Sequence, residues 1–342
     1  MKIWFDILTP KQYLFSEYFI KKLRKQHKIV TTSRKYEQVN GIEKFGSTKS
    51  IVVGKHGGKN NFDKLIASLD RSKFLAKRII TIKPDVLISY GSPEASRIAF
   101  GLGIPHIVFT DSPHAIAVMK LTLPYVSKLL TPWIIPKNDF KGFGIDSKNI
   151  IQYRAIDAGI IIKNYTKKKR KKSKNQKIIL IRPEESEASY INKKNKTIEI
   201  LEKIIQKFPD EKKIVLSRYK PQTNEIKKIS GKNLKVFSKP INGNELLENV
   251  DCFIGSGGTM TAEAGLLGIP TISLNTAPNR IEEYLVKNEI VVRSESTNRI
   301  SREVFQALNN ENIIKKRKQK AKKLIASFED PYQVLLRTIH GL

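Results

Sequence analysis

The sequence is poor in cysteine, in acidic residues and in long apolar stretches. Its single cysteine, Cys252, excludes an internal disulfide framework and a zinc site built from several cysteines. No Asp-x-Asp pair occurs, and no group of His, Asp and Glu has the spacing of metal ligands, so we expect no metal ion. Stretches without Lys, Arg, Asp or Glu, such as residues 98–110, are too short to cross a bilayer.

The start of the chain does not resemble a targeting segment. Asp6 stands where a signal peptide would have its apolar core, and a lone cysteine suits a reducing compartment. We therefore expect a cytoplasmic protein. A peripheral position at the inner face of the membrane stays open as an alternative.

Positive charge is in large excess. The 63 Lys and Arg outnumber the 32 Asp and Glu, which gives a formal net charge of +31. Both halves of the chain share this excess, and Lys greatly outnumbers Arg, a pattern that genome composition alone can produce. With either origin, the surface attracts anions such as nucleotides, acidic lipids and nucleic acid.

Strands and helices are predicted to alternate along the chain. The predicted strands are apolar without alternation, which is typical of a parallel sheet covered on both faces, and repeated strand–helix units predict a doubly wound α/β fold. They are residues 2–8, 28–32, 50–53, 85–89 and 106–110 in the first half and 178–181, 213–217, 234–237, 251–254 and 271–274 in the second.

The length of 342 residues exceeds the roughly 250–300 residues that usually share one core, so we expect two domains. We place them at residues 1–155 and 156–325, with a last helix in 326–342 that returns to the first domain. A run of nine basic residues and no acid, 163–177, lies near the break. It is either a solvated linker or a contact with anionic lipid.

Two stretches resemble each other and suggest related halves. Residues 85–105 read as a strand from Asp85, a glycine turn, a helix and then Gly-Ile-Pro. Residues 251–270 repeat this order from Asp251. Gly103 and Gly268 suit the position after a helix end, where a left-handed backbone is common.

The sharpest motif is the turn Gly255-Ser256-Gly257-Gly258-Thr259, which follows a predicted strand and opens a helix. Free N–H groups and the helix dipole favour an anion there, and glycines let a phosphate approach the main chain. In the alternative reading, Ser256 or Thr259 only caps the helix. Glu263 lies further along the same helix.

The stretch 255–270 resembles the nucleotide-binding element of GT-B nucleotide-sugar enzymes. The transferase that makes lipid II has a Ser-Gly-small turn, a Glu seven residues after the Ser and then Gly-x-Pro, and Ser256 and Glu263 match this spacing. UDP-N-acetylglucosamine 2-epimerases have a similar element that matches with one gap. The resemblance implies that the turn holds a diphosphate and that Glu263 binds the ribose hydroxyls.

Nearly the whole chain resembles a largely archaeal family, domain of unknown function 354, which is grouped with GT-B proteins. The resemblance implies two Rossmann-like, doubly wound domains that face a cleft. It is carried by residues 4–12, 54–58, 109–115, 181–184 and the turn at 255.

Candidate acid–base groups come from the first half. His56 lies in a glycine-rich loop after a strand, and the epimerases have a similar loop. Asp111 and His114 follow the strand 106–110, at the edge where open α/β sheets bind ligands, and Asp6 lies near the same edge. Each of these groups could instead be a structural polar residue. The loop 9–12 lacks the Gly-Gly-Thr-Gly-Gly-His loop of the lipid II transferase, so its catalytic step does not carry over.

Two further features could contact a phosphate or a membrane. Arg182, and less strongly Arg218, end strands of the second half and suit a phosphate, or else lie on the surface. The segment 115–135 has amphipathic aromatic and Lys residues that suit a membrane interface, but it fits a core helix and strand better.

The motifs together predict a metal-independent GT-B glycosyltransferase that needs no cofactor and takes a UDP-sugar donor in cell-envelope, glycolipid or glycan synthesis. His56, Asp111 or His114 would deprotonate an acceptor hydroxyl, and the basic surface suggests a lipid-phosphate acceptor or an anionic membrane. One alternative is a sugar 2-epimerase, which needs no acceptor. The other is a non-enzymatic binder of anions or nucleic acid. No helix-turn-helix, zinc-finger or RNP pattern occurs, so we expect no specific nucleic-acid partner.

Overall fold

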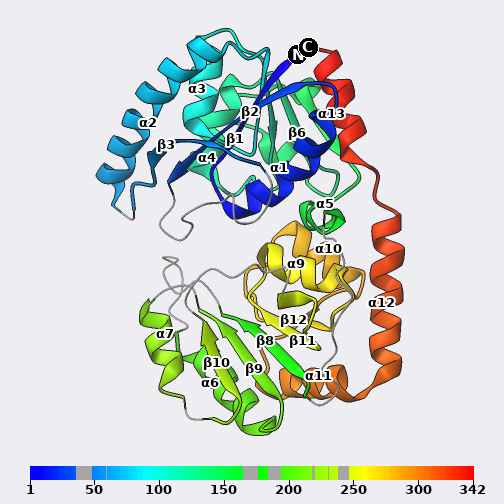
Figure 1. Ribbon diagram of the computed structural model, residues 1–342. Helices are drawn as coiled ribbons and strands as arrows, with labels where there is room; N and C mark the ends of the chain where they lie inside the picture. The colour runs from blue at the N-terminus through cyan, green and yellow to red at the C-terminus, as the bar shows by residue number, and fades with distance from the viewer. Residues whose placement is uncertain are drawn as a thin grey trace. The chain divides into compact units, whose positions relative to one another are not determined.

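The computed structural model describes residues 1–35, 48–58, 60–164, 176–183, 194–217, 220–229, 231–237 and 246–342. The chain forms two compact units, Met1–Asn164 with Phe328–Leu342, and Tyr165–Ser327 (Figure 1). The boundary therefore lies later than residue 155, where the sequence analysis places it. The reason is helix α5 (Asp157–Lys163), which packs against α1 (Pro10–Leu23) of the first unit.

The last helix, α13 (Pro331–His340), is part of the first unit. Polar contacts hold the segment that leads into it. The Glu329 N–H donates to the carbonyl of Arg154 over 2.9 Å. Asp330 accepts from the Tyr18 hydroxyl and the Lys22 ammonium, each over 2.6 Å.

The first unit contains a seven-stranded sheet in the order β3-β2-β1-β4-β5-β6-β7, with every neighbouring pair parallel. Its strands are β1 (Lys2–Ile7), β2 (Lys28–Lys35), β3 (Ile51–Lys55), β4 (Val86–Ser89), β5 (His106–Phe109), β6 (Lys128–Pro132) and β7 (Ile150–Tyr153). Besides α1, α5 and α13, its helices are α2 (Asn61–Ile82), α3 (Pro93–Gly101) and α4 (Ile116–Thr122), with short 3-10 turns at Leu123–Tyr125, Lys137–Phe140 and Ser147–Asn149.

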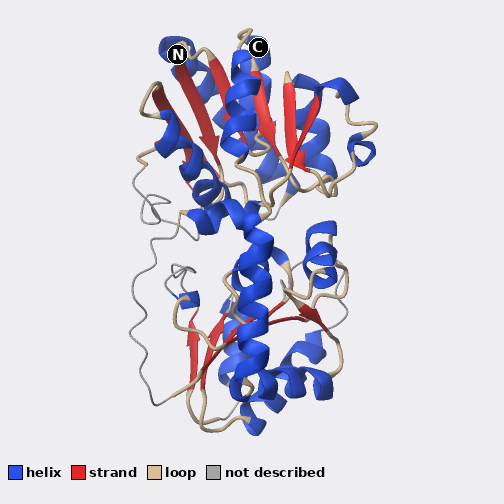
Figure 2. Cartoon of the chain, turned by 90° about the vertical axis from the view of Figure 1, so that its right-hand side faces the viewer, coloured by secondary structure: helices blue, strands red, loops and turns tan. Residues whose placement is uncertain are grey.

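The second unit contains a six-stranded parallel sheet in the order β10-β9-β8-β11-β12-β13. Its strands are β8 (Ile178–Arg182), β9 (Lys212–Leu216), β10 (Leu234–Phe237), β11 (Cys252–Gly255), β12 (Thr271–Ser273) and β13 (Val292–Arg293). The helices in the described part of this unit include α6 (Lys194–Lys207), α7 (Lys220–Lys227), α9 (Gly258–Leu266), α10 (Arg280–Lys287), α11 (Thr297–Asn309) and α12 (Glu311–Ala326). Figure 2 shows the strands of each unit side by side, with helices against them. The predicted doubly wound α/β architecture is confirmed.

The two stretches that resemble each other in sequence adopt the same local structure. Asp85 Oδ2 accepts from the N–H of Lys2 over 2.6 Å, and Asp251 Oδ2 accepts from the N–H of Ile178 over 2.9 Å. In both cases the acid lies just before a strand and binds the first residues of the neighbouring strand. The helix that follows is terminated in both units by a glycine with positive φ, 68° and 76°.

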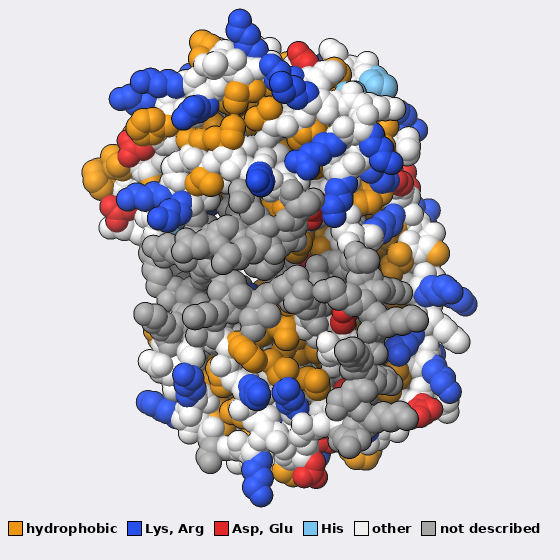
Figure 3. Space-filling view, in the orientation of Figure 1, with side chains coloured by type: hydrophobic (Ala, Val, Ile, Leu, Met, Phe, Trp, Pro, Cys, Tyr) orange, Lys and Arg blue, Asp and Glu red, His pale blue; other side chains and the backbone are white. Residues whose placement is uncertain are grey.

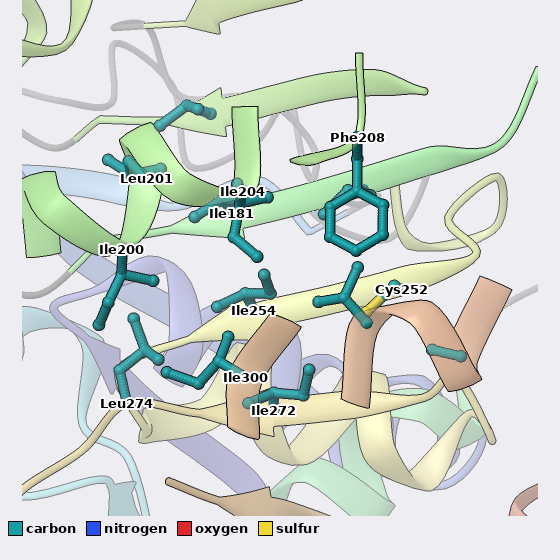
Figure 4. Close-up of a cluster of buried hydrophobic side chains, with 14 of the residues drawn as sticks. Ile181, Ile200, Leu201, Ile204, Phe208, Cys252, Ile254, Ile272, Leu274 and Ile300 are labelled. Carbon is teal, nitrogen blue, oxygen red and sulfur yellow. The ribbon is translucent and has the colours of Figure 1, made fainter. Parts of the chain in front are cut away.

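Each sheet is covered by apolar side chains. In the second unit, strands β8, β11 and β12 contribute Ile181, Ile254 and Ile272 to a core that α6 and α11 close from one side (Figure 4). The apolar runs of the predicted strands are thus buried, as a sheet with helices on both faces requires. None of the helices in the described part of the chain is both long and apolar enough to span a bilayer.

Candidate active site

Four polar side chains lie together at the carboxyl end of the first unit's sheet. Lys11 lies in the first turn of α1 after β1, Tyr90 follows β4, Asp111 lies just beyond β5, and Asp157 begins α5 after β7. The strand order reverses between β1 and β4. Ligands of open α/β sheets bind outside the carboxyl ends of the strands at such a switch point. The cluster therefore occupies the place where this architecture binds ligands.

The ammonium group of Lys11 joins two carboxylates. Its Nζ lies 2.8 Å from Oδ2 of Asp111 and 2.9 Å from Oδ2 of Asp157. Lys11 also donates to the Tyr90 hydroxyl oxygen over 3.1 Å, and the Tyr90 hydroxyl donates to Asp157. The Tyr153 hydroxyl donates to Oδ1 of Asp157 over 3.3 Å. These hydrogen bonds fix the positions of all five side chains.

The two acids of the cluster have pKa values that are shifted in opposite directions. Burial by itself raises the pKa of Asp111, but the Lys11 ammonium and the hydrogen bonds of Asp111 with Asp157, Lys11 and Tyr90 together outweigh burial and hold that pKa well below its usual range. Burial and the Asp111 carboxylate raise the pKa of Asp157 to about 7, against the attraction of Lys11. Burial lowers the pKa of Lys11, yet the two carboxylates raise it above its ordinary value. Near neutral pH, Asp111 is ionised and Asp157 titrates.

The members of the cluster differ in access to solvent. The exposed fraction is 27% for the Lys11 side chain, 10% for Asp111 and 2% for Asp157. Lys11 and Asp111 therefore form the accessible layer, and Asp157 lies behind them. An ionised carboxylate beside a protonated one can take up a proton and pass one on, which is the requirement of general acid–base chemistry.

The structure does not bring the two predicted histidines to this cluster. His56 follows β3, the edge strand, which is four strands away from β5 in the sheet, or about 19 Å at the usual strand spacing. Its Nδ1 accepts from the N–H of Gly58 over 3.1 Å, so the ring shapes its own loop. His114 lies close to Asp111 in sequence, but its side chain is exposed. Of the three predicted catalytic residues, only Asp111 lies in the cluster.

Asp6, the further acid at this edge, has a structural role. It is fully buried, and its Oδ1 lies 2.7 Å from Nη2 of Arg71 on α2. The hydroxyls of Thr32 and Ser92 donate to the same carboxylate over 2.5 and 2.6 Å. Arg71 in turn donates to the carbonyl of Val53 over 3.1 Å. This network ties α2 to the strands β1, β2 and β3, and all of its side chains are buried.

The predicted anion-binding turn lies at the switch point of the second sheet. The strand order reverses between β8 and β11, and Gly255 at the end of β11 pairs in register with Arg182 at the end of β8. On its other side, Gly255 pairs with Ser273 of β12. The structure thus brings Arg182 and the turn Gly255–Thr259 to one place, with Ser256, Gly257 and Thr259 half-buried and Gly258 exposed.

Helix α9 begins without a side-chain cap. Its N-cap residue is Gly257, which has no side chain to accept a hydrogen bond from the first turn, so the reading of Ser256 or Thr259 as the cap is wrong. The opening N–H groups of a helix are donors that intrahelical bonds leave free. Together with the helix dipole, they favour an anion at this end.

Gly257 is required by both its backbone and its surroundings. Its φ of +83° lies in the left-handed region, and a Cβ there would come within 2.6 Å of Asn275 Nδ2 and 2.7 Å of Glu282 Oε2. Glu282 is buried and accepts from the Ser273 hydroxyl and from Asn275 Nδ2, each over 2.5 Å. The hydrogen-bonded side chains of Ser273, Asn275 and Glu282 lie next to the turn, and Asn275 and Glu282 leave no room for a side chain at position 257.

Some of the remaining predicted site residues lie in the described part of the chain, and others lie outside it. Glu263 lies in α9 and is buried, and Arg182 is half-buried. Arg218 and most of the basic run 163–177 lie outside the described residues. Among the side chains that the structure describes, no group of three or more His, Cys, Asp and Glu could hold a metal ion.

Sequence reasoning missed Lys11, Tyr90, Asp157 and Glu282. One signal was available for Tyr90, which directly follows a correctly predicted strand on the same edge as Asp111. Lys11 also stands just after the first strand, between a helix cap and an apolar run. Asp157 had no such signal, because the short strand before it was not predicted.

Solved structures with similar folds come from two kinds of enzyme. A UDP-GlcNAc 2-epimerase from Neisseria meningitidis, bound to UDP-GlcNAc, matches with a TM-score of 0.69 at 15% identity, covering 100% of both chains. Spinosyn rhamnosyltransferase matches with a TM-score of 0.63 at 11% identity, also covering 100% of both chains. At such identities these matches show the fold, and the predicted GT-B fold is confirmed.

Sequence comparison gives the family. An uncharacterized protein of Methanocaldococcus jannaschii is 29% identical over 309 residues, which cover 86% of this chain and 88% of that protein. Residues 1–341 match the family described as "Protein of unknown function (DUF354)". The match spans nearly the whole chain, and the predicted family is therefore confirmed: the chain belongs to the DUF354 family.

Proposed function

We propose that this protein is a GT-B nucleotide-sugar enzyme that binds the diphosphate of a UDP-sugar at the turn Gly255–Thr259. The observation that carries the proposal is the uncapped start of α9 at the switch point of the second sheet, beside Arg182. Free N–H groups, a helix dipole and a guanidinium are the groups that bind a diphosphate without a metal. The choice of UDP is supported by the UDP-GlcNAc bound to the Neisseria enzyme of similar fold.

The proposed reaction is transfer of the sugar to a hydroxyl acceptor. The ionised carboxylate of Asp111 takes the proton of the acceptor hydroxyl, and the acceptor oxygen forms a bond to the anomeric carbon. The bond between that carbon and the diphosphate oxygen breaks, and UDP leaves with the bonding electrons. Lys11 keeps Asp111 ionised, as the low pKa of Asp111 indicates. The acceptor class that fits the basic chain is a lipid that has a phosphate group for the basic surface and a free hydroxyl as the nucleophile.

A second candidate, 2-epimerisation of the sugar, is favoured by one specific observation. An epimerase must remove a proton from C2 and return one, which requires acid and base groups side by side. Asp111 and Asp157 are held in this relation by one ammonium group, with different protonation. The fold of the Neisseria 2-epimerase adds support.

One incubation distinguishes the two reactions. The protein is mixed with UDP-sugars, first without an acceptor and then with a sugar linked to polyprenyl diphosphate, which has free hydroxyls, and the products are separated by chromatography. Glycosyl transfer predicts a sugar product only with the acceptor, whereas a 2-epimerised sugar without acceptor would establish the epimerase. Asp111→Asn should abolish either reaction, while Asp146→Asn, an exposed acid of the same unit, should leave it unchanged. Full activity of Asp111→Asn would contradict the assignment of the base.

Binding is tested separately by thermal shift with a panel of nucleotide sugars. Gly257→Val places a branched side chain against Asn275 and Glu282, and Glu263→Ala removes the proposed partner of the ribose, so both should abolish the stabilisation by UDP-sugar. Gly341→Ala is the control, because a Cβ there meets nothing closer than 3.4 Å. Unchanged stabilisation of both variants would show that the nucleotide site lies elsewhere.

A further inference from the structure

Helix α2 has apolar side chains on the side opposite to its core. Its buried positions include Ala67, Leu75 and Ile79, which follow helical spacing along one face. A second set with the same spacing is exposed on the other side. This set comprises Phe62 (68% exposed), Leu65 (54%), Leu69 (58%) and Ile80 (59%). A helix that only covered a sheet would have polar residues there.

The apolar surface continues on the neighbouring helices. Helix α2 packs against α3 and α3 packs against α4, so the three form one layer on the sheet. Phe100 at the end of α3 and Ile116 and Leu121 on α4 are more than half exposed. Figure 3 shows apolar side chains gathered over this part of the first unit, with Lys and Arg among them. We call this outer surface of α2, α3 and α4 the α2–α4 face.

The charged residues of the α2–α4 face are mostly basic. Exposed acids between Asn61 and Tyr125 are few, and they are Asp63, Asp70 and Asp85. The exposed basic residues in the same range are Lys64, Lys73, Lys77, Arg78, Lys83, Arg97 and Lys120. Lys73 and Lys77 lie on the same side of α2 as Leu69 and Ile80, since their positions differ by helical turns. Apolar and basic groups are therefore interleaved on one surface.

We propose that the α2–α4 face docks on a bilayer of anionic lipid. Apolar side chains of an amphipathic surface enter the boundary between headgroups and acyl chains, and neighbouring Lys and Arg side chains bind the lipid phosphates. A second copy of the chain is a poorer partner, because two such faces would bring their positive charges together. The proposal does not depend on the proposed reaction, since it rests on surface residues outside both candidate sites.

Vesicle flotation tests the proposal with the full chain. Wild-type protein should float with phosphatidylglycerol–phosphatidylcholine vesicles and remain behind with phosphatidylcholine alone. Leu65→Gln with Leu69→Gln should weaken binding about tenfold or more, because two exposed apolar side chains are lost from the contact. Lys73→Glu with Lys77→Glu should weaken it at least tenfold as well. Phe305→Ser removes a similarly exposed aromatic (52%) from α11 of the second unit and should have no effect.

Two results would overturn the proposal. Equal flotation of the wild type and both double variants would show that the α2–α4 face is not the contact. A wild-type dimer in light scattering that the Leu65→Gln and Leu69→Gln variant converts to monomer would identify a second copy as the occupant. All exchanged side chains are exposed, and circular dichroism confirms that each variant is folded. No nucleotide sugar is present, so failure here is distinct from failure of the proposed reaction.

Discussion

Asp157 keeps its proton in the folded protein at pH values where the unfolded chain loses it. Burial and the Asp111 carboxylate raise the pKa of Asp157 from 3.8 to about 7. Between these two values Asp157 binds a proton in the folded state and not in the unfolded state, so its contribution to stability falls as the pH rises through this window. The gap between the pKa values corresponds to about 4 kcal/mol between pH ~4 and pH ~8. A loss of this size is a large part of the stability of a typical domain.

Asp111 contributes with the opposite sign at lower pH. Its pKa in the folded state lies well below the ordinary value, because the attraction of Lys11 and the hydrogen bonds of its neighbours together outweigh burial. Its stabilising contribution is therefore present above the unfolded pKa of 3.8 and is lost as the pH falls below it. The contribution of the pair to stability is therefore largest near the unfolded pKa of both acids.

Tryptophan fluorescence during urea unfolding measures this effect in the right unit. Both tryptophans, Trp4 and Trp133, belong to the first unit. Buried His106, whose pKa is lowered from 6.5 to about 3, contributes with the opposite sign over the same range, so the contribution of Asp157 is read from the difference between variants. From pH ~4 to pH ~8, the unfolding free energy of the wild type should fall by about 4 kcal/mol relative to that of Asp157→Asn. Asp146→Asn is exposed and should keep the wild-type slope. The same slope in Asp157→Asn as in the wild type would refute the reasoning.

Three further predictions concern buried charge and the thiol. Arg71→Met leaves Asp6 buried without its cation and should cost the first unit about 3–5 kcal/mol in the same urea assay; a cost below about 1 kcal/mol would contradict this. Lys11→Met should raise the pKa of Asp111, so the activity profile should shift to higher pH, and an unshifted profile would exclude Lys11 as the group that sets this pKa. Cys252 is fully buried, and burial raises the pKa of its thiol to about 12, so a thiol reagent at neutral pH should react only at the rate of unfolding; rapid labelling of the native protein would be inconsistent.

The candidate anion site in the second unit could be predicted from the sequence, because its main residues are close together in the chain. The turn Gly255–Thr259 and the helix after it form a contiguous motif, and the glycine positions follow from backbone conformation. Arg182 could be placed beside the turn because both residues end strands of one sheet. Glu282 could not be identified, since its role depends on a side-chain contact with Gly257 that no spacing reveals.

The cluster around Lys11 in the first unit was harder to predict, because the order of the strands in the sheet decides which side chains meet. His56 and Asp111 both follow strands, yet β3 is an edge strand and β5 lies beyond the centre, so the two side chains cannot meet. Lys11 and Asp157 are far apart in the chain and meet only because α5 packs against α1. Strand order and helix packing come from long-range contacts, which single-sequence periodicity does not contain.

The most direct test of the central claim is hydrogen–deuterium exchange with and without UDP. If the diphosphate binds the turn Gly255–Thr259, UDP should slow exchange in the peptide that covers the turn and the first turn of α9, because its N–H groups then donate to the ligand. Gly257→Val should abolish this protection, and Gly341→Ala should retain it. Binding of UDP with protection elsewhere and none at this peptide would contradict the account.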